Sequence, residues 1–240
     1  MIIILGAMDS EINEFLSRLE NPQQLHWNGF TQHRGRLEGQ EVLVSKSGVG
    51  KVMSAMVTQH LIDDWQPRAV IFTGLAGSLR SHIHIGDTLL AADLVQHDLE
   101  SAGLRLPRGQ VPFSDYRFLP SHPVLLQLAA AFTPSQGKLH QGRICTGDQF
   151  ITHREMDSHA YLTEELDGDG VEMEGASVAL VCSVNQVPFL VARTISDRAD
   201  GSASANFEAF LPQASQNSLD LVQFLLPRIA RANLSPETRS

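Results

Sequence analysis

Short apolar runs rich in β-branched residues alternate along the chain with longer stretches in which apolar residues recur at helical spacing. The short runs predict strands at residues 2–5, 42–45, 69–73, 88–95 and 187–195. The helical spacing predicts helices at residues 12–19, 52–61, 124–132, 175–181 and 207–229. Pro212 and Pro227 are expected to interrupt or kink the last of these helices. The alternation is typical of an α/β protein, in which helices cover a central sheet.

The length of the chain favours one domain. With 240 residues and 42% hydrophobic content, it can bury a single substantial core. We expect one domain over residues 1–232, followed by a polar, frayed tail over residues 233–240. Residues 99–121 contain prolines and glycines with little periodicity, so they predict a long surface loop of the kind that often carries function.

Composition and charge exclude several classes of protein. The 18 Lys and Arg residues against 27 Asp and Glu give a formal net charge of -9, which opposes the phosphate contacts that dominate nucleic-acid binding. No stretch approaches the roughly 20 apolar residues that span a bilayer, and the run at 2–5 lacks the flanks of a signal peptide. Cys145 and Cys182 match no disulfide framework. We therefore expect a soluble, cytoplasmic protein that binds neither nucleic acid nor membrane.

The ten histidines form no metal-binding motif. His82 and His84 stand as an isolated pair in an expected loop, and the sequence has no HExxH motif and no Cys/His cluster. The sequence therefore predicts neither a metal nor another cofactor.

Carboxylates follow three of the predicted strands. Glu11 comes shortly after the first strand, Glu172 and Glu174 lie two apart between an apolar strand and an Ala- and Val-rich helix, and Asp197 follows the last strand. Because open α/β sheets bind ligands beyond the carboxyl ends of their strands, these acids can face one cleft. Two acids framed by core-like sequence need polar partners, which a sugar with vicinal hydroxyls would supply.

Each of these signals also has a purely structural interpretation. The first acid could merely favour a helix N-terminus electrostatically. Of the pair, one acid could face the solvent while the other caps the following helix. Asp197 could be a surface acid paired with Arg193 or Arg198, an arrangement that usually contributes little stability. The residues alone leave these alternatives open.

Two glycine-rich segments, 47–51 and 73–78, follow strands and are interpreted as turns that let the backbone approach a ligand closely. Neither matches a P-loop or a dinucleotide-binding fingerprint. The first lacks the distant glycine of a P-loop, and the second lacks the third glycine and the acidic residue of a dinucleotide site. Ordinary tight turns remain the alternative interpretation.

Taken in order, these segments resemble the family of 5′-methylthioadenosine/S-adenosylhomocysteine nucleosidases, within the nucleoside phosphorylase superfamily. The segments that carry the resemblance span nearly the whole chain: 6–8 with Glu11, 46–52, 73–77, 147–150, 171–174, Arg193 with 195–197, and Phe207 with Phe210. Segments 94–98 and 147–150 also resemble the subset of the family that serves menaquinone synthesis and hydrolyses 6-amino-6-deoxyfutalosine.

The resemblance implies a fold, a reaction and an assembly. The fold is a three-layer α/β/α sandwich with a central mixed β-sheet, like that of nucleoside phosphorylases. The reaction is the hydrolytic release of adenine from 5′-substituted adenosines. The assembly is a homodimer in which the partner subunit lends residues to each pocket.

Cleavage of an N-ribosyl bond forms a cationic, oxocarbenium-like sugar and a poor leaving group. An acid must therefore protonate the base, and a carboxylate must activate water. By resemblance, Asp197 protonates adenine N7, Glu11 activates the water, Glu174 binds the ribose hydroxyls and Arg193 assists at the water.

The resemblance also assigns residues that contact the substrate. An aromatic ring and an apolar wall can hold the two faces of a flat base. Phe150 is expected to stack on adenine, Ile151 to read its edge through the backbone, and Met173 to pack under the ribose. The remaining expected contacts are Met8, Val49, Leu75, Ala76, Gly77, Glu172, Ser196 and Phe207.

The chain departs from the family pattern at two places. Leu75 stands where many members carry a serine whose hydroxyl helps to hold the nucleophilic water. Leu104 and Leu106 stand where aromatic residues commonly reach into the 5′ pocket of the neighbouring subunit. These differences leave the reaction unchanged but predict a permissive apolar slot for the 5′ group.

Two other functions, phosphorolysis and nucleoside binding without turnover, fit these residues less well. A phosphorolytic enzyme of the same fold would need arginines and hydroxyls around phosphate, whereas Leu75 offers no hydroxyl and Glu11 would repel the anion. A nucleoside-binding protein without turnover would have no requirement for Glu11, Glu174 and Asp197 together.

Overall fold

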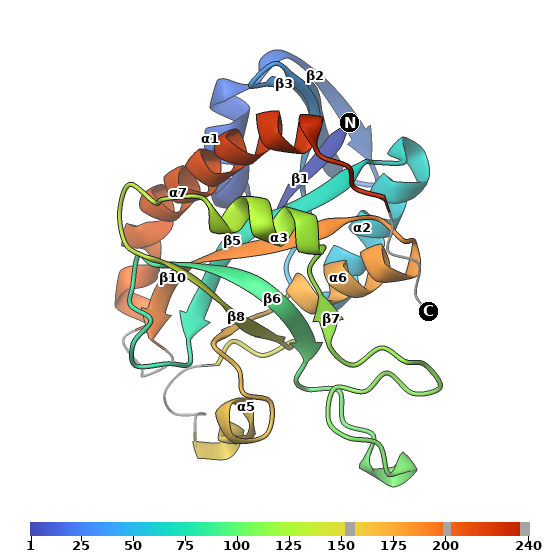
Figure 1. Ribbon diagram of the computed structural model, residues 1–240, viewed down its shortest axis with the longest axis vertical. Coiled ribbons are helices and arrows are strands. Elements are labelled where there is room, and N and C mark those ends of the chain that lie inside the picture. Colours follow the sequence, from blue (N-terminus) through green and yellow to red (C-terminus); the bar gives the residue numbers. More distant parts are fainter. Residues whose placement is uncertain (152–156, 199–202, 236–240) are drawn as a thin grey trace.

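The computed structural model describes residues 1–151, 157–198 and 203–235, without the side chains of residues 157, 198 and 203–209. Within these residues, helices pack on both sides of a ten-stranded sheet (Figure 1). The elements are, in chain order, β1 (Ile2–Gly6), α1 (Asp9–Arg18), β2 (Glu20–Trp27), β3 (Phe30–Leu37), β4 (Gln40–Lys46), α2 (Lys51–Trp65), β5 (Ala69–Ser78), β6 (Thr88–Gln96), η1 (Ala102–Leu104), β7 (Leu119–Pro120), α3 (Pro123–Ala130), β8 (Leu139–Thr146), η2 (Asp157–His159), α5 (Tyr161–Glu164), β9 (Gly170–Glu172), α6 (Gly175–Val184), β10 (Phe189–Arg198) and α7 (Ala203–Arg231).

Strand β1 shows how the sheet separates two helical layers. Ile3 and Leu5 pack in the apolar cluster that contains residues of α2 and α6, whereas Ile2 and Ile4 pack in the cluster that contains α1, α3 and α7. Successive side chains of a strand point to opposite faces, so the burial of all four means that both faces of the sheet are covered. The predicted three-layer α/β/α sandwich is confirmed.

The sheet is mixed, as predicted. Strands β4, β1, β5 and β10 pair in parallel, and β10 pairs antiparallel with β6. Strand β6 continues in parallel to β8 and then β9, and β9 returns antiparallel to β5. The parallel strands therefore direct their carboxyl ends toward one region, where Arg193 pairs with Gly74 and Asp197 pairs with Gly77.

The segment 73–78 is not a turn, and that prediction was wrong. It continues β5, whose residues pair with β10 on one side and, at Gly77 and Ser78, with β9 on another. Its glycines serve the close approach of side chains instead. A Cβ atom at Gly74 would lie 2.6 Å from Glu11 Oε1 and 2.7 Å from Arg193 Nη1. The other segment, 47–51, does connect a strand to a helix, and Gly48 and Gly50 have positive φ values there.

Two helices differ from expectation. The last helix was predicted to be interrupted or kinked at Pro212 and Pro227; it is not interrupted, since α7 runs through both prolines. In α2, Val57 and Leu61 are buried, whereas the other apolar residues of the helical pattern are exposed: Val52, Met53 and Met56. The apolar residues of α2 therefore form two faces, and one of them does not cover the sheet.

Strands β2, β3 and β8 were not predicted, and neither was the two-residue strand β7, which lies in the segment predicted as a loop. Strand β2 is mostly exposed, and the first part of β8 carries polar residues, so neither shows the apolar run of a buried strand. Both are held by pairing with neighbours, β2 with β3 and β8 with β6 and β9. Within the described residues, no helix is long and apolar enough to cross a membrane.

Candidate active site

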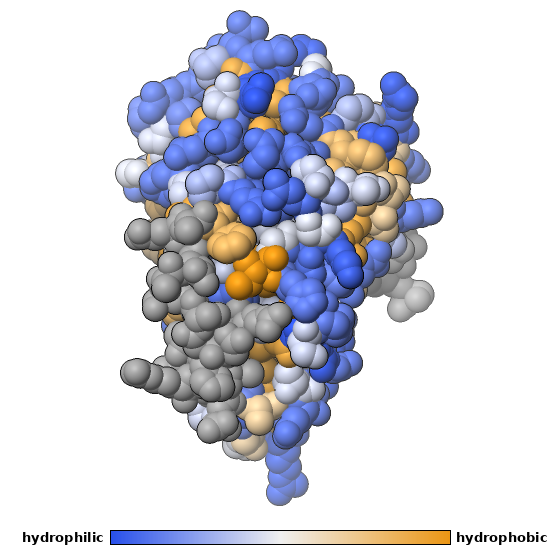
Figure 2. All heavy atoms as spheres, turned by 90° about the vertical axis from the view of Figure 1, so that its left-hand side faces the viewer, coloured by the Kyte–Doolittle hydropathy of each residue, from blue (hydrophilic) through white to orange (hydrophobic). Residues whose placement is uncertain are grey.

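A cavity opens where the parallel strands end. Figure 2 shows the face of the molecule toward which β5 and β10 run, where apolar side chains are exposed within a largely hydrophilic surface. The cavity is lined by Ala7, Met8, Glu11, Val49, Leu75, Ala76, Gly77, Gln149, Phe150, Ile151, Val171, Glu172, Met173, Glu174, Ser196 and Asp197.

The Glu11 carboxylate stabilises the start of α1 and also lines the cavity. Its Oε2 accepts the backbone N–H groups of Ala7 at 2.6 Å and Met8 at 3.0 Å, and its Oε1 accepts that of Leu75 at 3.1 Å. Burial raises the pKa of Glu11, while the charge of Arg193 and the three N–H groups lower it in part. Glu11 therefore both stabilises a helix N-terminus and faces a cleft, as its two interpretations from the sequence expected.

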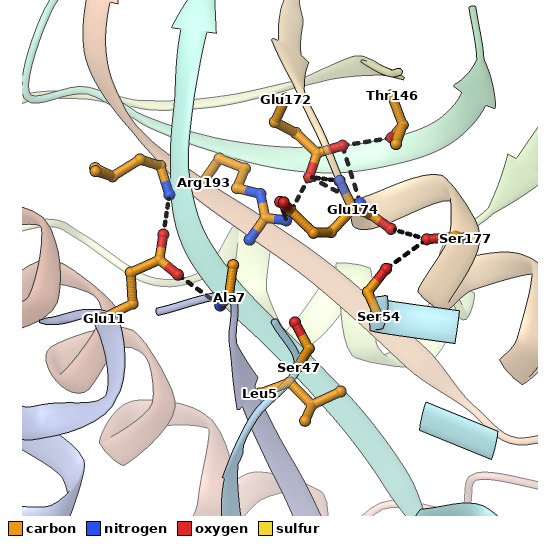
Figure 3. A network of polar contacts seen from close by, with 12 residues as sticks. Leu5, Ala7, Glu11, Ser47, Ser54, Thr146, Glu172, Glu174, Ser177 and Arg193 are labelled. Carbon is orange, nitrogen blue, oxygen red and sulfur yellow. Dashed lines mark hydrogen bonds and ion pairs between the residues drawn. The ribbon is translucent and has the colours of Figure 1, made fainter. Parts of the chain in front are cut away.

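Arg193 lies between Glu11 on one side and Glu172 and Glu174 on the other, with a side chain only 1% exposed (Figure 3). Its Nη2 donates to Glu172 Oε2 at 2.5 Å and lies 3.8 Å from Glu174 Oε2. Its guanidinium carbon stacks 4.0 Å from the centre of the Phe72 ring. Burial works against the charged form, but Glu172, Glu174 and Glu11 outweigh it and raise the pKa of Arg193. The guanidinium therefore stays charged among three carboxylates.

Two donors of Arg193 remain available. Its buried Nε and Nη1 atoms have no hydrogen-bond partner among the described residues. Nη1 faces the same small space as Glu11 Oε1, because both atoms lie within 3 Å of the position that a Gly74 Cβ would take. Buried donors without partners are costly, so a water molecule shared by Nη1 and Glu11 would satisfy both groups.

Glu172 and Glu174 face different partners. Glu172 is held by Thr146, Arg193 and backbone N–H groups at the start of α6. Among the described residues, Glu174 accepts a hydrogen bond from the Gly50 N–H to Oε1 at 2.9 Å. Burial first, and then the charge of Glu172, raise the pKa of Glu174 to about 7. Glu174 is therefore the member of the pair with acceptor capacity left for a ligand.

Asp197 is 4% exposed at the far end of β10, so it is not a surface acid. The Ser196 hydroxyl donates to its Oδ1 at 2.7 Å. A Cβ atom at Gly77 would lie 3.1 Å from Asp197 Oδ2, so the glycine leaves room for the carboxylate. Asp197 thus lines the cavity as a buried carboxyl held in place by its neighbour.

The segment after β8 brings Phe150 and Ile151 to the cavity. It is tied down by polar contacts: the Asp148 N–H donates to Asp98 Oδ2 at 2.9 Å, and Asp148 Oδ1 accepts the Lys51 N–H at 2.8 Å. The Lys51 ammonium donates to Asp98 Oδ1 at 2.6 Å. These contacts join the aromatic segment to the N-terminus of α2.

The structure brings most of the predicted site residues together around one cavity. Arg193 lies directly behind it, and Leu104 and Leu106 do not line it within the described chain. The Phe207 side chain lies outside the described residues. Sequence reasoning missed three lining residues, each adjacent in sequence to a predicted contact: Ala7, Gln149 and Val171.

The fold and this site define a protein of the phosphorylase superfamily, whose family model matches residues 1–227. Within it, the chain belongs to the family of 5′-methylthioadenosine/S-adenosylhomocysteine nucleosidases. The predicted family, fold class and enzyme class, an N-glycosidase, are thereby confirmed.

Three relatives support this membership. A nucleosidase of that name from Chromohalobacter salexigens is 34% identical over 97% of this chain and 99% of its own length. An aminodeoxyfutalosine nucleosidase from Helicobacter pylori is 36% identical over 94% of this chain and 97% of its own. A solved nucleosidase structure from Colwellia psychrerythraea, in complex with adenine, has a TM-score of 0.89 and 31% identity, covering 98% of this chain and 97% of its own.

Proposed function

We propose that this chain hydrolyses the bond between adenine and ribose in 5′-substituted adenosines, including 5′-methylthioadenosine and S-adenosylhomocysteine. The observation that carries this proposal is the charge of the cavity wall: among the described lining residues, four are carboxylates and none is Lys, Arg or His. Phosphate would need cations there. The charge of Arg193, behind the wall, is already opposed by Glu172, Glu174 and Glu11. The site therefore favours water over phosphate as the nucleophile.

The residues divide the reaction between them. As the bond between N9 and C1′ breaks, its electron pair goes to adenine, and the Asp197 carboxyl donates a proton to N7. Water attacks C1′ and gives its proton to Glu11, whose raised pKa makes it a better base. Arg193 Nη1 holds that water, and Glu174 accepts the ribose hydroxyls. Negative carboxylates around the cationic sugar stabilise the transition state.

Leu75 fits this division. Its side chain offers no hydroxyl to the water, but its backbone N–H donates to Glu11 Oε1. The Glu11 carboxylate, which acts as the general base, is therefore fixed by three backbone N–H groups. The water is held by Glu11 and Arg193.

Adenine release from a panel of nucleosides tests this function. The panel contains 5′-methylthioadenosine, S-adenosylhomocysteine, 5′-deoxyadenosine and 6-amino-6-deoxyfutalosine. It covers both kinds of relative, the 5′-methylthioadenosine/S-adenosylhomocysteine nucleosidases and the aminodeoxyfutalosine nucleosidase. Asp197→Asn and Glu11→Gln are each expected to lower kcat by about 10²-fold or more. If the Asp197 variant turned over at a near-normal rate, the acid role would belong to another residue.

The proposed assembly is a homodimer whose second copy completes the 5′ pocket with Leu104 and Leu106. Support comes from apolar residues that the single chain leaves exposed: Val52 at 76%, Met53 at 40% and Met56 at 41% on α2. A contiguous apolar patch of this kind is typical of an interface. Charged substitutions at these positions should shift the protein from dimer to monomer in light scattering. A wild-type chain that is monomeric at working concentration would contradict this assembly.

A cytoplasmic location is proposed on the state of the cysteines. Cys145 and Cys182 are free and buried, and burial raises the pKa of Cys145 to about 12. Such thiols behave as small core residues and suit a reducing compartment.

A further inference from the structure

We propose that Glu172 is a positioning residue that fixes Arg193 and the start of α6, and that it does not bind the sugar. This inference rests on the proposed hydrolysis. It separates the roles of two acids that stand two residues apart and line the same cavity.

The acceptor capacity of Glu172 is already used within the chain. The Thr146 hydroxyl donates to Oε1, and the Gly175 N–H lies 2.9 Å from Oε1 and 2.8 Å from Oε2. The Glu174 N–H donates to Oε2 at 3.0 Å, and Arg193 Nη2 donates to the same atom. A carboxylate offers about four lone-pair sites, and these donors take them up. A ribose hydroxyl would have to displace one of them.

The placement of these donors follows from the fold. Thr146 and Glu172 are directly paired in the parallel register of β8 and β9, at the ends of both strands. Glu174 and Gly175 begin α6, where backbone N–H groups have no partners inside the helix. Glu172 therefore holds the junction between a strand, a helix and the guanidinium (Figure 3).

The consequence for Arg193 is a fixed rotation of its planar group. With Nη2 bound to Glu172 and the guanidinium carbon over the Phe72 ring, Nη1 is left facing Glu11 across Gly74. The guanidinium is a rigid fork, so holding one tip sets the direction of the other. Glu172 thus determines where the attacking water is held, although it touches neither water nor sugar.

Glu172 also acts on Glu174 through its charge. Burial is the largest cause of the raised pKa of Glu174; among the charges of described residues, Glu172 and Glu11 raise this pKa and Arg193 lowers it. Removing the Glu172 charge should therefore lower the pH at which Glu174 ionises. A residue that served packing alone would leave that pH unchanged.

A double-mutant cycle with two substrates tests the assignment. Glu172→Gln is expected to lower kcat by about 10²-fold through misplacement of the water. If it acts through Arg193, the double variant with Arg193→Gln should be little worse than Arg193→Gln alone. Multiplicative losses in the double variant would overturn the proposed route.

The second substrate is the 2′-deoxy analogue of 5′-methylthioadenosine. At a pH well above 7, where Glu174 is ionised in every variant that keeps it, the loss in kcat caused by Glu172→Gln should be the same for both sugars. The loss caused by the matched control Glu174→Gln should shrink when the hydroxyl is absent. A Glu172 loss that depends on the 2′-hydroxyl would make Glu172 a sugar ligand and overturn the proposal.

The pH dependence of KM gives a third readout. Its transition near the pKa of Glu174 should move to lower pH in Glu172→Gln. An unchanged transition would contradict the proposed effect of the Glu172 charge on Glu174. If Glu172→Gln does not fold, Thr146→Val loosens the same carboxylate and should lower kcat equally for both sugars. A wild-type chain that releases no adenine would refute the proposed function instead, so the two failures can be told apart.

Discussion

Gly74→Ala places a methyl group at the point where the proposed water, Glu11 and Arg193 meet. Its Cβ atom would lie 2.6 Å from Glu11 Oε1, 2.7 Å from Arg193 Nη1 and 3.0 Å from Glu11 Cδ. Contacts this short force the neighbours to move. Glu11 is anchored by three backbone N–H groups and Arg193 by Glu172, so neither can yield without losing a hydrogen bond.

The expected loss follows from the roles of these two groups. A displacement of about 1 Å at a reacting group costs about 10²-fold in rate, so kcat should fall by about that factor. KM should change much less, because Gly74 is not among the residues that line the cavity. Initial rates of adenine release, measured over a range of 5′-methylthioadenosine concentrations, separate the two constants.

Gly29→Ala is the matched control for Gly74→Ala. Gly29 has a φ of +83° and no atom within 4 Å of its added Cβ, so the substitution strains the backbone without crowding the site. It should cost about 1–2 kcal/mol of stability and leave kcat unchanged. A folded Gly74→Ala variant with near-normal kcat would refute the placement of the water between Glu11 and Arg193.

Two further predictions concern Glu174 and the 5′ pocket. Burial raises the pKa of Glu174 to about 7 from 4.5, so this carboxyl stabilises the fold at low pH and that stability is lost as the pH rises through about 7. Chemical denaturation should therefore show Glu174→Gln gaining stability over the wild type as the pH rises, and a constant difference would contradict the raised pKa. Discrimination among 5′-alkylthio groups should stay within about 1–3 kcal/mol per methylene in kcat/KM, whereas inosine analogues should be strongly rejected. If a steep preference for one 5′-alkylthio group persisted in both Leu104→Ala and Leu106→Ala, residues other than these two leucines would form the 5′ pocket.

The sequence predicts best those elements whose residues are buried on both faces. Strand β1 and the first part of β5, residues 69–72, are fully buried and appear in the sequence as uninterrupted apolar runs. Strand β2 is stabilised by pairing with β3 while most of its side chains stay exposed, so its composition carries little signal. The hydrophobic pattern therefore predicts the apolar strands of the sheet and misses more polar strands, such as β2 and β8, that are held by pairing.

Site residues follow a similar rule. Glu11 and Asp197 could be assigned through the resemblance to the nucleosidase family, because the residues alone left a structural interpretation of each acid open. The different partners of Glu172 and Glu174 could not, because they depend on Thr146, which is 26 residues away in sequence, and on Gly50, which is 124 residues away. Likewise, the glycines of β5 look like turn residues until the side chains of Glu11 and Arg193 are placed against Gly74.

The source of the oxygen on the released sugar tests the central claim most directly. The measurement is adenine release from 5′-methylthioadenosine in ¹⁸O-labelled water, in phosphate-free buffer with a chelator, followed by mass spectrometry of the sugar. Activation of water by Glu11 predicts full turnover and a free sugar with one ¹⁸O atom at C1′. Turnover that appears only after phosphate is added, with a sugar 1-phosphate as the product, would contradict the account.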